Sequence, residues 1–422
     1  MNENFLHFVW KYQKFDSSEL ETTTHQKLVV FNPGNHNHDS GPDFEEARIK
    51  IGEIEWAGNV EIHLRSSDWD KHKHSENPAY KNVILHVVWE NDLEIMIDKT
   101  PIPTLELKQL IDPKLISSYT KHVNVSEPIA CANQFSSELE MAYVSMLDKV
   151  MVERLERKAE DVLSILKETK NDWDETCYRV LAQNFGFSLN KSAFQKLGEI
   201  LSFSVLKKNL SESKKSEALL FGQAGFLNNS VDTYQNELAQ EFRFLSKKHE
   251  LPAPLNQHEW KFGKMRPANF PSLRIAQFAS LFVSQPRLFT SLIDSSDSKE
   301  TIELLEFELS DYWNNHYDFG KKRKGVKNAL GKGTQENILI NTVAPLLAAY
   351  AKHSSNQNYM ESALEILEKL PAEGNRITKE WNKIGKKPKT AFESQAQIQL
   401  FNEYCQKRRC LSCSIGVTLL NK

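Results

Sequence analysis

The spacing of apolar residues changes once along the chain, and this change restricts the possible folds more than any other feature. Up to about residue 107, short apolar runs end at turn residues, as where Lys27 to Phe31 meets Asn32 to Gly34, which is typical of strands. From about residue 138, apolar residues recur every three or four positions, which is typical of helices. We therefore expect an α+β protein, with a mixed α/β domain and a mainly antiparallel sheet over residues 1–125, and an all-α domain over residues 126–422.

The same patterns predict individual elements. Residues 1 to about 15 predict a short helix, and strand-like runs at 47–54, 55–65 and 82–89 are expected to pair as a meander. A long helix is predicted from Glu138 to Lys170. Further helices are predicted at 172–186, 191–204, 213–226, 230–248, 272–282, 300–316, 334–352, 358–370 and 390–405.

Bulk properties exclude some classes of protein. The net charge of −3 gives no overall positive field for nucleic acid, although it is compatible with a local basic surface. No apolar run approaches the roughly 20 residues that cross a bilayer, and the first residues lack the apolar core of a secretory signal. We expect a cytoplasmic protein without a membrane partner, in which the five cysteines form no disulfide framework. The oligomeric state stays open.

A group of acidic and histidine side chains marks the candidate site. Six of the 13 histidines lie between residues 36 and 86. Glu61 and His63 are two apart on a predicted strand and so project from one face, and Asp43 precedes the strand expected to pair with theirs. Carboxylates suit Mg²⁺ or Mn²⁺. We predict Asp43 and Glu61 as catalytic metal ligands and His63 as the group that orients or deprotonates water, assisted by His74 or His86.

Each histidine also has a structural alternative. His86 lies in the apolar run 83–88, where it can be a core histidine bonded to backbone, and His72 and His74 are compatible with a solvated loop. Asp43, Glu61 and His63 together favour function, because matched faces and buried charge seldom coincide without cause.

Along nearly its full length the chain resembles a bacterial family of proteins of unknown function, DUF2851. The resemblance implies a common architecture and supplies no activity. It rests on Gly41 to Phe44, Gly58 to His63, Ser67 to Trp69, Ile84 to Val88, Arg266 to Pro271 and the C-terminal cysteines.

A second, local resemblance is to the PD-(D/E)XK nucleases, through Pro42-Asp43 and Glu61-Ile62-His63. It implies that Asp43 and Glu61 bind magnesium and that His63 stands where the superfamily has a lysine. A neutral imidazole can act as a base, but it lacks the permanent charge of lysine. The superfamily also places a helix before the next strand, for which only residues 70–80 are available here, with Pro78 among them.

The C-terminal cysteines form a second candidate site. Cys405, Cys410 and Cys413 lie within nine residues, and the last two have a spacing that lets both thiolates reach one metal. Cys131 is the preferred fourth ligand, ahead of Cys177. Four thiolates suit zinc or an iron–sulfur cluster, and the distribution resembles that of PD-(D/E)XK nucleases whose cluster is held by one early and three late cysteines. The alternative is a set of buried thiols.

Cations and aromatics alternate over residues 260–274, a combination that can contact phosphates and stack on bases. Lys261, Arg266 and Arg274 from this segment, together with Arg65, are predicted nucleic-acid contacts. For Arg266 and Arg274 the alternative is structural, with guanidinium groups that tie loops together.

The leading hypothesis is a divalent-metal-dependent nuclease or nucleic-acid-processing hydrolase. One alternative is a non-catalytic nucleic-acid-binding or scaffold protein in which the cysteines hold a structural metal. Another is a metallohydrolase that acts on a small substrate through a histidine-rich zinc site.

Overall fold

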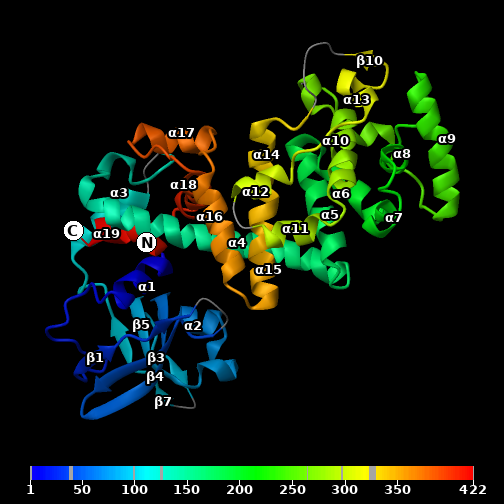
Figure 1. Cartoon of the computed structure of the whole chain (residues 1–422). Helices are drawn as coiled ribbons and strands as arrows, with labels where there is room; N and C mark the ends of the chain where they lie inside the picture. Colours follow the sequence, from blue (N-terminus) through cyan, green and yellow to red (C-terminus); the bar gives the residue numbers. More distant parts are fainter. Residues whose placement is uncertain are drawn as a thin grey trace. The chain divides into compact units, whose positions relative to one another are not determined.

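The computed structural model describes residues 2–37, 41–97, 100–123, 127–263, 265–295, 298–322 and 329–421 (Figure 1). The chain forms two compact units, one of residues 1–146 with 400–422 and one of residues 147–399. The C-terminal cysteines therefore belong to the first unit, rather than to the helical part as predicted. The boundary predicted between residues 125 and 126 lies within residues 124–126, which are outside the described residues.

The first unit is built on a mixed sheet with the strand order β1-β3-β4-β5-β8, and β2 pairs with β3. Strands β1, β3 and β4 are antiparallel neighbours, whereas β5 runs parallel to both β4 and β8. The elements of this unit are α1 (Glu3–Lys11), β1 (Leu28–Asn32), β2 (Asn35–His36), β3 (Phe44–Ile51), β4 (Ile54–Arg65), α2 (Asp68–Lys71), η1 (His74–Glu76), η2 (Pro78–Tyr80), β5 (Val83–Glu90), β6 (Met96–Ile97), β7 (Thr100–Pro101), β8 (Thr104–Glu106), α3 (Pro113–Val123), η3 (Ala132–Gln134), η4 (Ser137–Leu139), η8 (Phe401–Cys405), η9 (Cys410–Ser412) and α19 (Ser414–Leu420).

The α+β class is confirmed, but the predicted antiparallel meander is wrong for β5 and β8. The cause is the segment between β4 and β5, which folds into α2 and two 3₁₀ turns. This segment brings the chain back toward the end of the sheet at which β4 begins, so that β5 runs in the same direction as β4. Pro78 is compatible with this path because it occupies the first turn of η2, where its missing N–H costs no hydrogen bond. Strand spacing alone does not reveal such a crossover, because it carries no information on strand direction.

Side-chain alternation along β4 and β5 separates a core face from a polar face. Val60, Ile62, Leu85 and Val87 pack into the main core with the apolar side chains of α1. Between them, Glu61, His63 and His86 project from the other face, where a smaller cluster that includes Trp69 and Tyr80 covers the sheet. This polar face is the setting of the candidate site.

The close pairing of β4 with β5 requires a glycine at position 58. A Cβ there would lie 2.5 Å from Cγ2 of Ile84 and 2.7 Å from the carbonyl oxygen of Asn82. The glycine allows Glu61 to align with His86 across the parallel pair.

The second unit is helical, but "all-α" is not fully correct because β9 and β10 form a hairpin. Helix α4 (Glu140–Glu168) matches the long helix predicted, whereas the helix predicted at 300–316 is two short ones. Its other elements are α5 (Trp173–Phe185), α6 (Phe187–Ile200), α7 (Phe203–Lys207), α8 (Ser213–Gln223), α9 (Thr233–Lys248), η5 (Gln257–Glu259), η6 (Pro267–Asn269), α10 (Pro271–Ser284), α11 (Leu288–Asp294), α12 (Ser298–Glu303), α13 (Asp311–Asn315), β9 (His316–Asp318), β10 (Lys321–Lys322), α14 (Lys332–Ile338), η7 (Leu339–Val343), α15 (Ala344–Ser354), α16 (Asn358–Lys369), α17 (Arg376–Lys383) and α18 (Ala391–Leu400). Within the described part of the chain, no helix has the length and apolar character needed to cross a membrane.

Candidate functional site

Two carboxylates lie side by side where the beginning of β3 pairs with β4. Asp43 immediately precedes β3, and its backbone N–H donates a hydrogen bond of 3.1 Å to Oε2 of Glu61. In return, Oδ2 of Asp43 accepts a 2.9 Å bond from the N–H of Ile62. These reciprocal bonds hold the two acidic side chains side by side, as the sequence predicts.

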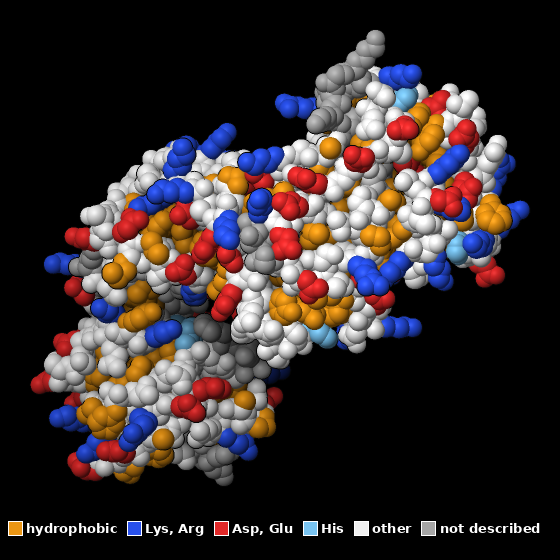
Figure 2. All heavy atoms as spheres, viewed as in Figure 1, with side chains coloured by type: hydrophobic (Ala, Val, Ile, Leu, Met, Phe, Trp, Pro, Cys, Tyr) orange, Lys and Arg blue, Asp and Glu red, His pale blue; other side chains and the backbone are white. Residues whose placement is uncertain are grey.

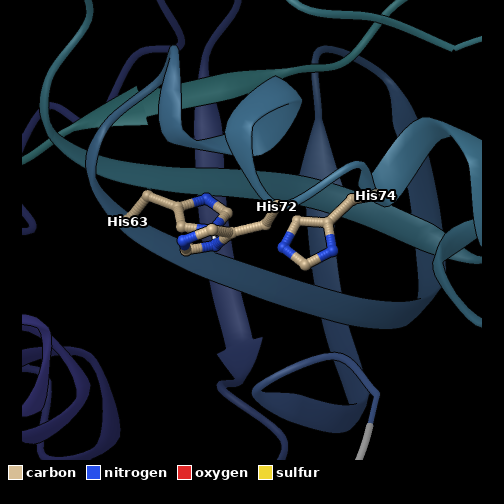
Figure 3. Close-up of side chains that lie close together, drawn as sticks. All are labelled: His63, His72 and His74. Carbon is tan, nitrogen blue, oxygen red and sulfur yellow. Dashed lines mark hydrogen bonds between the residues drawn. The ribbon is translucent and has the colours of Figure 1, made fainter.

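Imidazoles surround the carboxyl group of Glu61. Its Oε1 lies 3.5 Å from Nε2 of His63 and 3.2 Å from Nε2 of His74. The His63 ring also contacts Nε2 of His86 through Nδ1 at 2.9 Å and Nδ1 of His72 through Nε2 at 3.1 Å. Figure 3 shows the rings of His63 and His72 lying against each other, with His74 beside them.

His72 and His74 lie on the crossover between β4 and β5, which brings both toward His63. His72 is the C-cap that follows α2, His74 begins η1, and Lys73 between them has a left-handed backbone with φ of 57°. This reversal lets side chains only two positions apart both reach His63. Tyr80 stacks on His74 at 3.9 Å between ring centroids, and its hydroxyl donates to the carbonyl of Gly41, close to Asp43.

Burial determines the charge state of this cluster. Glu61 is 4% exposed and His63 is 1% exposed, whereas His72 is exposed. Burial, and then the adjacent Asp43, raise the pKa of Glu61 to about 9. Burial, followed by the neighbouring imidazoles, lowers the pKa of His63 to about 2, and burial lowers the pKa of His74 and of His86 to about 4. At neutral pH these three imidazoles are uncharged.

The donor set fits a divalent transition metal. The ligand atoms of His63, His72 and His74 all lie within 4.8 Å of one another, and Glu61 adds a carboxylate. The buried Nδ1 of His86 also lacks a hydrogen-bond partner, which costs free energy unless something else binds it. Imidazole with carboxylate suits zinc or manganese better than magnesium.

Helix α1 contributes a histidine that the sequence analysis did not select. Nε2 of His7 lies 3.3 Å from Oδ2 of Asp43. Glu3, one turn earlier, has a raised pKa because of burial and the nearby Asp43. The signal was present in the sequence, since residues 3 and 7 share a face of the predicted helix.

The predicted nucleic-acid contacts lie in different environments. Arg65 is exposed at the end of β4, and Lys261 and Arg266 are exposed in the second unit. Arg274 is only 5% exposed, and its guanidinium donates to the side-chain oxygens of Gln277 and Asn269. This burial agrees with the structural alternative for Arg274 and does not favour direct contact with a polymer.

The four predicted cysteines influence one another electrostatically, but among the described residues they do not form a compact set of ligand atoms as the histidines do. Burial raises the pKa of Cys405 well above its usual value, and the thiols of Cys131, Cys413 and Cys410 raise it further. Burial raises the pKa of Cys131 to about 12, again with contributions from Cys413 and Cys410. Cys177 lies in the other unit, and only burial and Asp174 raise its pKa. The electrostatic contact thus links Cys131, and not Cys177, with the C-terminal three.

The comparison with known families gives one match. The sequence model of a family described as "Protein of unknown function (DUF2851)" matches residues 3–376. The chain therefore belongs to this family. No curated protein and no solved structure gave a significant match.

We expect Co²⁺ to bind at the histidine cluster and to give weak visible bands of a nitrogen- and oxygen-ligated ion, which are distinct from the intense near-ultraviolet bands that Co²⁺ would give at the cysteines. His72→Ala should weaken this binding by at least about tenfold, because the mutation removes a ligand from an exposed position. A spectroscopic titration measures the effect. His25→Ala is the matched control, because the His25 side chain is 89% exposed and outside the cluster. Equal affinities of His72→Ala and His25→Ala would contradict the assignment.

Proposed function

We propose that this protein is a metal-dependent hydrolase that cleaves phosphodiester bonds in nucleic acid. The observation that carries the proposal is the convergence of two adjacent carboxylates and three imidazoles beside an exposed crossover. The local sequence resemblance to PD-(D/E)XK nucleases agrees with this activity, but the crossover between β4 and β5 contains only the four-residue helix α2 where that superfamily has a full helix.

In this proposal His63, His72, His74 and Glu61 hold the ion. When bound, a divalent ion polarises the phosphoryl oxygen and lowers the pKa of a bound water. The burial that lowers the pKa of His63 to about 2 makes its nitrogens poor proton acceptors but keeps them available as ligands. We therefore assign His63 as a ligand rather than as the base predicted from the sequence.

His7 is the better candidate for the proton acceptor. Its side chain is 15% exposed, and Nε2 faces Oδ2 of Asp43. A carboxylate this close to Nε2 favours the tautomer that carries its proton there, which leaves the lone pair of Nδ1 open. Asp43 would thus orient His7 as well as contribute negative charge beside Glu61.

Cations near the crossover support a phosphate-bearing substrate. Arg65, Lys71 and Lys73 are exposed at the end of β4 and around α2, next to His72. Figure 2 shows one face of the molecule, on which Lys and Arg side chains are interspersed with Asp and Glu. A few phosphate contacts from the crossover are enough to position a substrate there.

With Mn²⁺ or Zn²⁺, the purified chain is expected to cleave DNA or RNA, and Glu61→Gln should lower the rate by more than about tenfold because it removes an anionic ligand while keeping the shape. Gel assays with single- and double-stranded substrates of both kinds measure this, and His25→Ala, purified identically, controls for contaminating nucleases. The proposal is wrong if wild type and Glu61→Gln cleave equally, or if wild type cleaves none of these substrates with either metal.

We further propose that Cys131, Cys405, Cys410 and Cys413 hold a structural zinc ion or iron–sulfur cluster. Burial raises the pKa of Cys405, Cys131 and Cys410, and neighbouring thiols raise it further, so these three thiols stay protonated when no metal is bound. A guanidinium N–H of Arg408 donates to the carbonyl of Glu127 at 2.9 Å, which joins the C-terminal segment to the segment before Cys131.

Protein purified without oxygen is expected to contain zinc or iron, and Cys413→Ala should lose most of it because a three-thiolate site binds far more weakly. Elemental analysis and the visible absorption spectrum measure the content and the type of metal. Cys177→Ala is the matched control, a buried cysteine outside the group. A metal-free wild type, or equal metal in both variants, would contradict this proposal.

A further inference from the structure

The helical unit contains a cavity of ≈330 Å³ lined by residues of α6, α10 and α14. Ser188, Leu189 and Gly333 at its rim are exposed, whereas Phe185 and Phe194 are completely buried. The cavity is thus open to solvent at one side and apolar at the other. Its volume lies at the lower end of the range of about 300–1,000 Å³ that is usual for sites of small ligands.

A buried arginine without a counter-charge lines this cavity. Arg274 is 5% exposed, its Nε lacks a hydrogen-bond partner, and no carboxylate among the described residues forms an ion pair with it. The side-chain oxygens of Gln277, Asn269 and Thr334 accept from its terminal nitrogens. These neutral acceptors satisfy donors but leave the positive charge uncompensated, which is costly in an interior.

The backbone beside Arg274 is strained in a way that shapes the cavity. Phe187 has a φ of 47°, in the left-handed region that residues with side chains rarely adopt. This conformation places its ring 4.7 Å from the Arg274 guanidinium carbon. The ring attracts the cation weakly, and it gives the cavity an aromatic wall next to the charge.

We propose that this cavity binds a small ligand that carries a phosphate group and an apolar or aromatic part. The phosphate would accept hydrogen bonds from Arg274 and from the hydroxyl of Thr334, whose oxygen lies 3.4 Å from a guanidinium nitrogen. The apolar part would pack against Phe187 and Leu189. A nucleoside monophosphate has this combination of groups. The proposal is independent of the metal site and of the proposed nuclease activity.

Calorimetric titration of the full chain with adenosine 5′-monophosphate, inorganic phosphate and adenosine tests the proposal. Wild type is expected to bind the monophosphate and, more weakly, phosphate, but not adenosine. Arg274→Met should weaken binding at least about tenfold, because a charge-assisted hydrogen bond is lost. Arg274→Lys should give an intermediate affinity, since it keeps the charge and loses the planar fork.

Two further variants keep the test decisive if Arg274→Met does not fold. Thr334→Val removes the hydroxyl at the same volume and should weaken binding of the monophosphate, whereas Arg287→Met, at an exposed arginine of the same unit, should not. The proposal is overturned if wild type binds neither phosphate-bearing probe, if adenosine binds as tightly as its monophosphate, or if Thr334→Val and every folded Arg274 variant bind like Arg287→Met.

Discussion

The buried carboxyl group of Glu61 is the constraint on which the candidate site depends. An ionised carboxylate that is 4% exposed and adjacent to another acid costs several kcal/mol unless a proton or a cation compensates it. The raised pKa of Glu61 is the expression of this cost. The imidazoles of His63, His74 and His86 are kept neutral by the same burial, so they offer lone pairs rather than positive charge. A divalent cation would stabilise the acid and use those lone pairs together.

This arrangement depends on strand direction. Because β5 is parallel to β4, Glu61 aligns with His86, and the crossover between the strands passes over the polar face with His72 and His74. A direct hairpin would leave no chain to carry these histidines. The crossover also buries Trp69, which covers the cluster beside His63. The left-handed backbone at Lys73 and the parallel pairing of β4 with β5 thus both help to place the histidines of the candidate site.

Much of this could be predicted from the sequence, because periodicity records burial. It identified the sheet, the change to helices and the shared face of Glu61 and His63. It could not identify strand direction, the burial that disfavours His63 as a base, or the place of the C-terminal segment in the first unit, since these follow from tertiary contacts. Arg274 shows the same limit: cations among aromatics resemble a nucleic-acid surface in sequence, but burial makes this one a cavity residue. His7 could have been selected from the sequence, because it lies one helical turn from the acidic Glu3.

The family match extends over most of the chain without supplying an activity, so the chemistry of the site has to be established directly. The central claim is that the polar face of the sheet is a metal centre. Diffraction from crystals soaked in Mn²⁺ or Zn²⁺, recorded at the absorption edge of the metal, tests it most directly. The account predicts an anomalous peak bonded to nitrogens of His63, His72 and His74 and to an oxygen of Glu61. Crystals with ordered metal elsewhere and none between these side chains would contradict it.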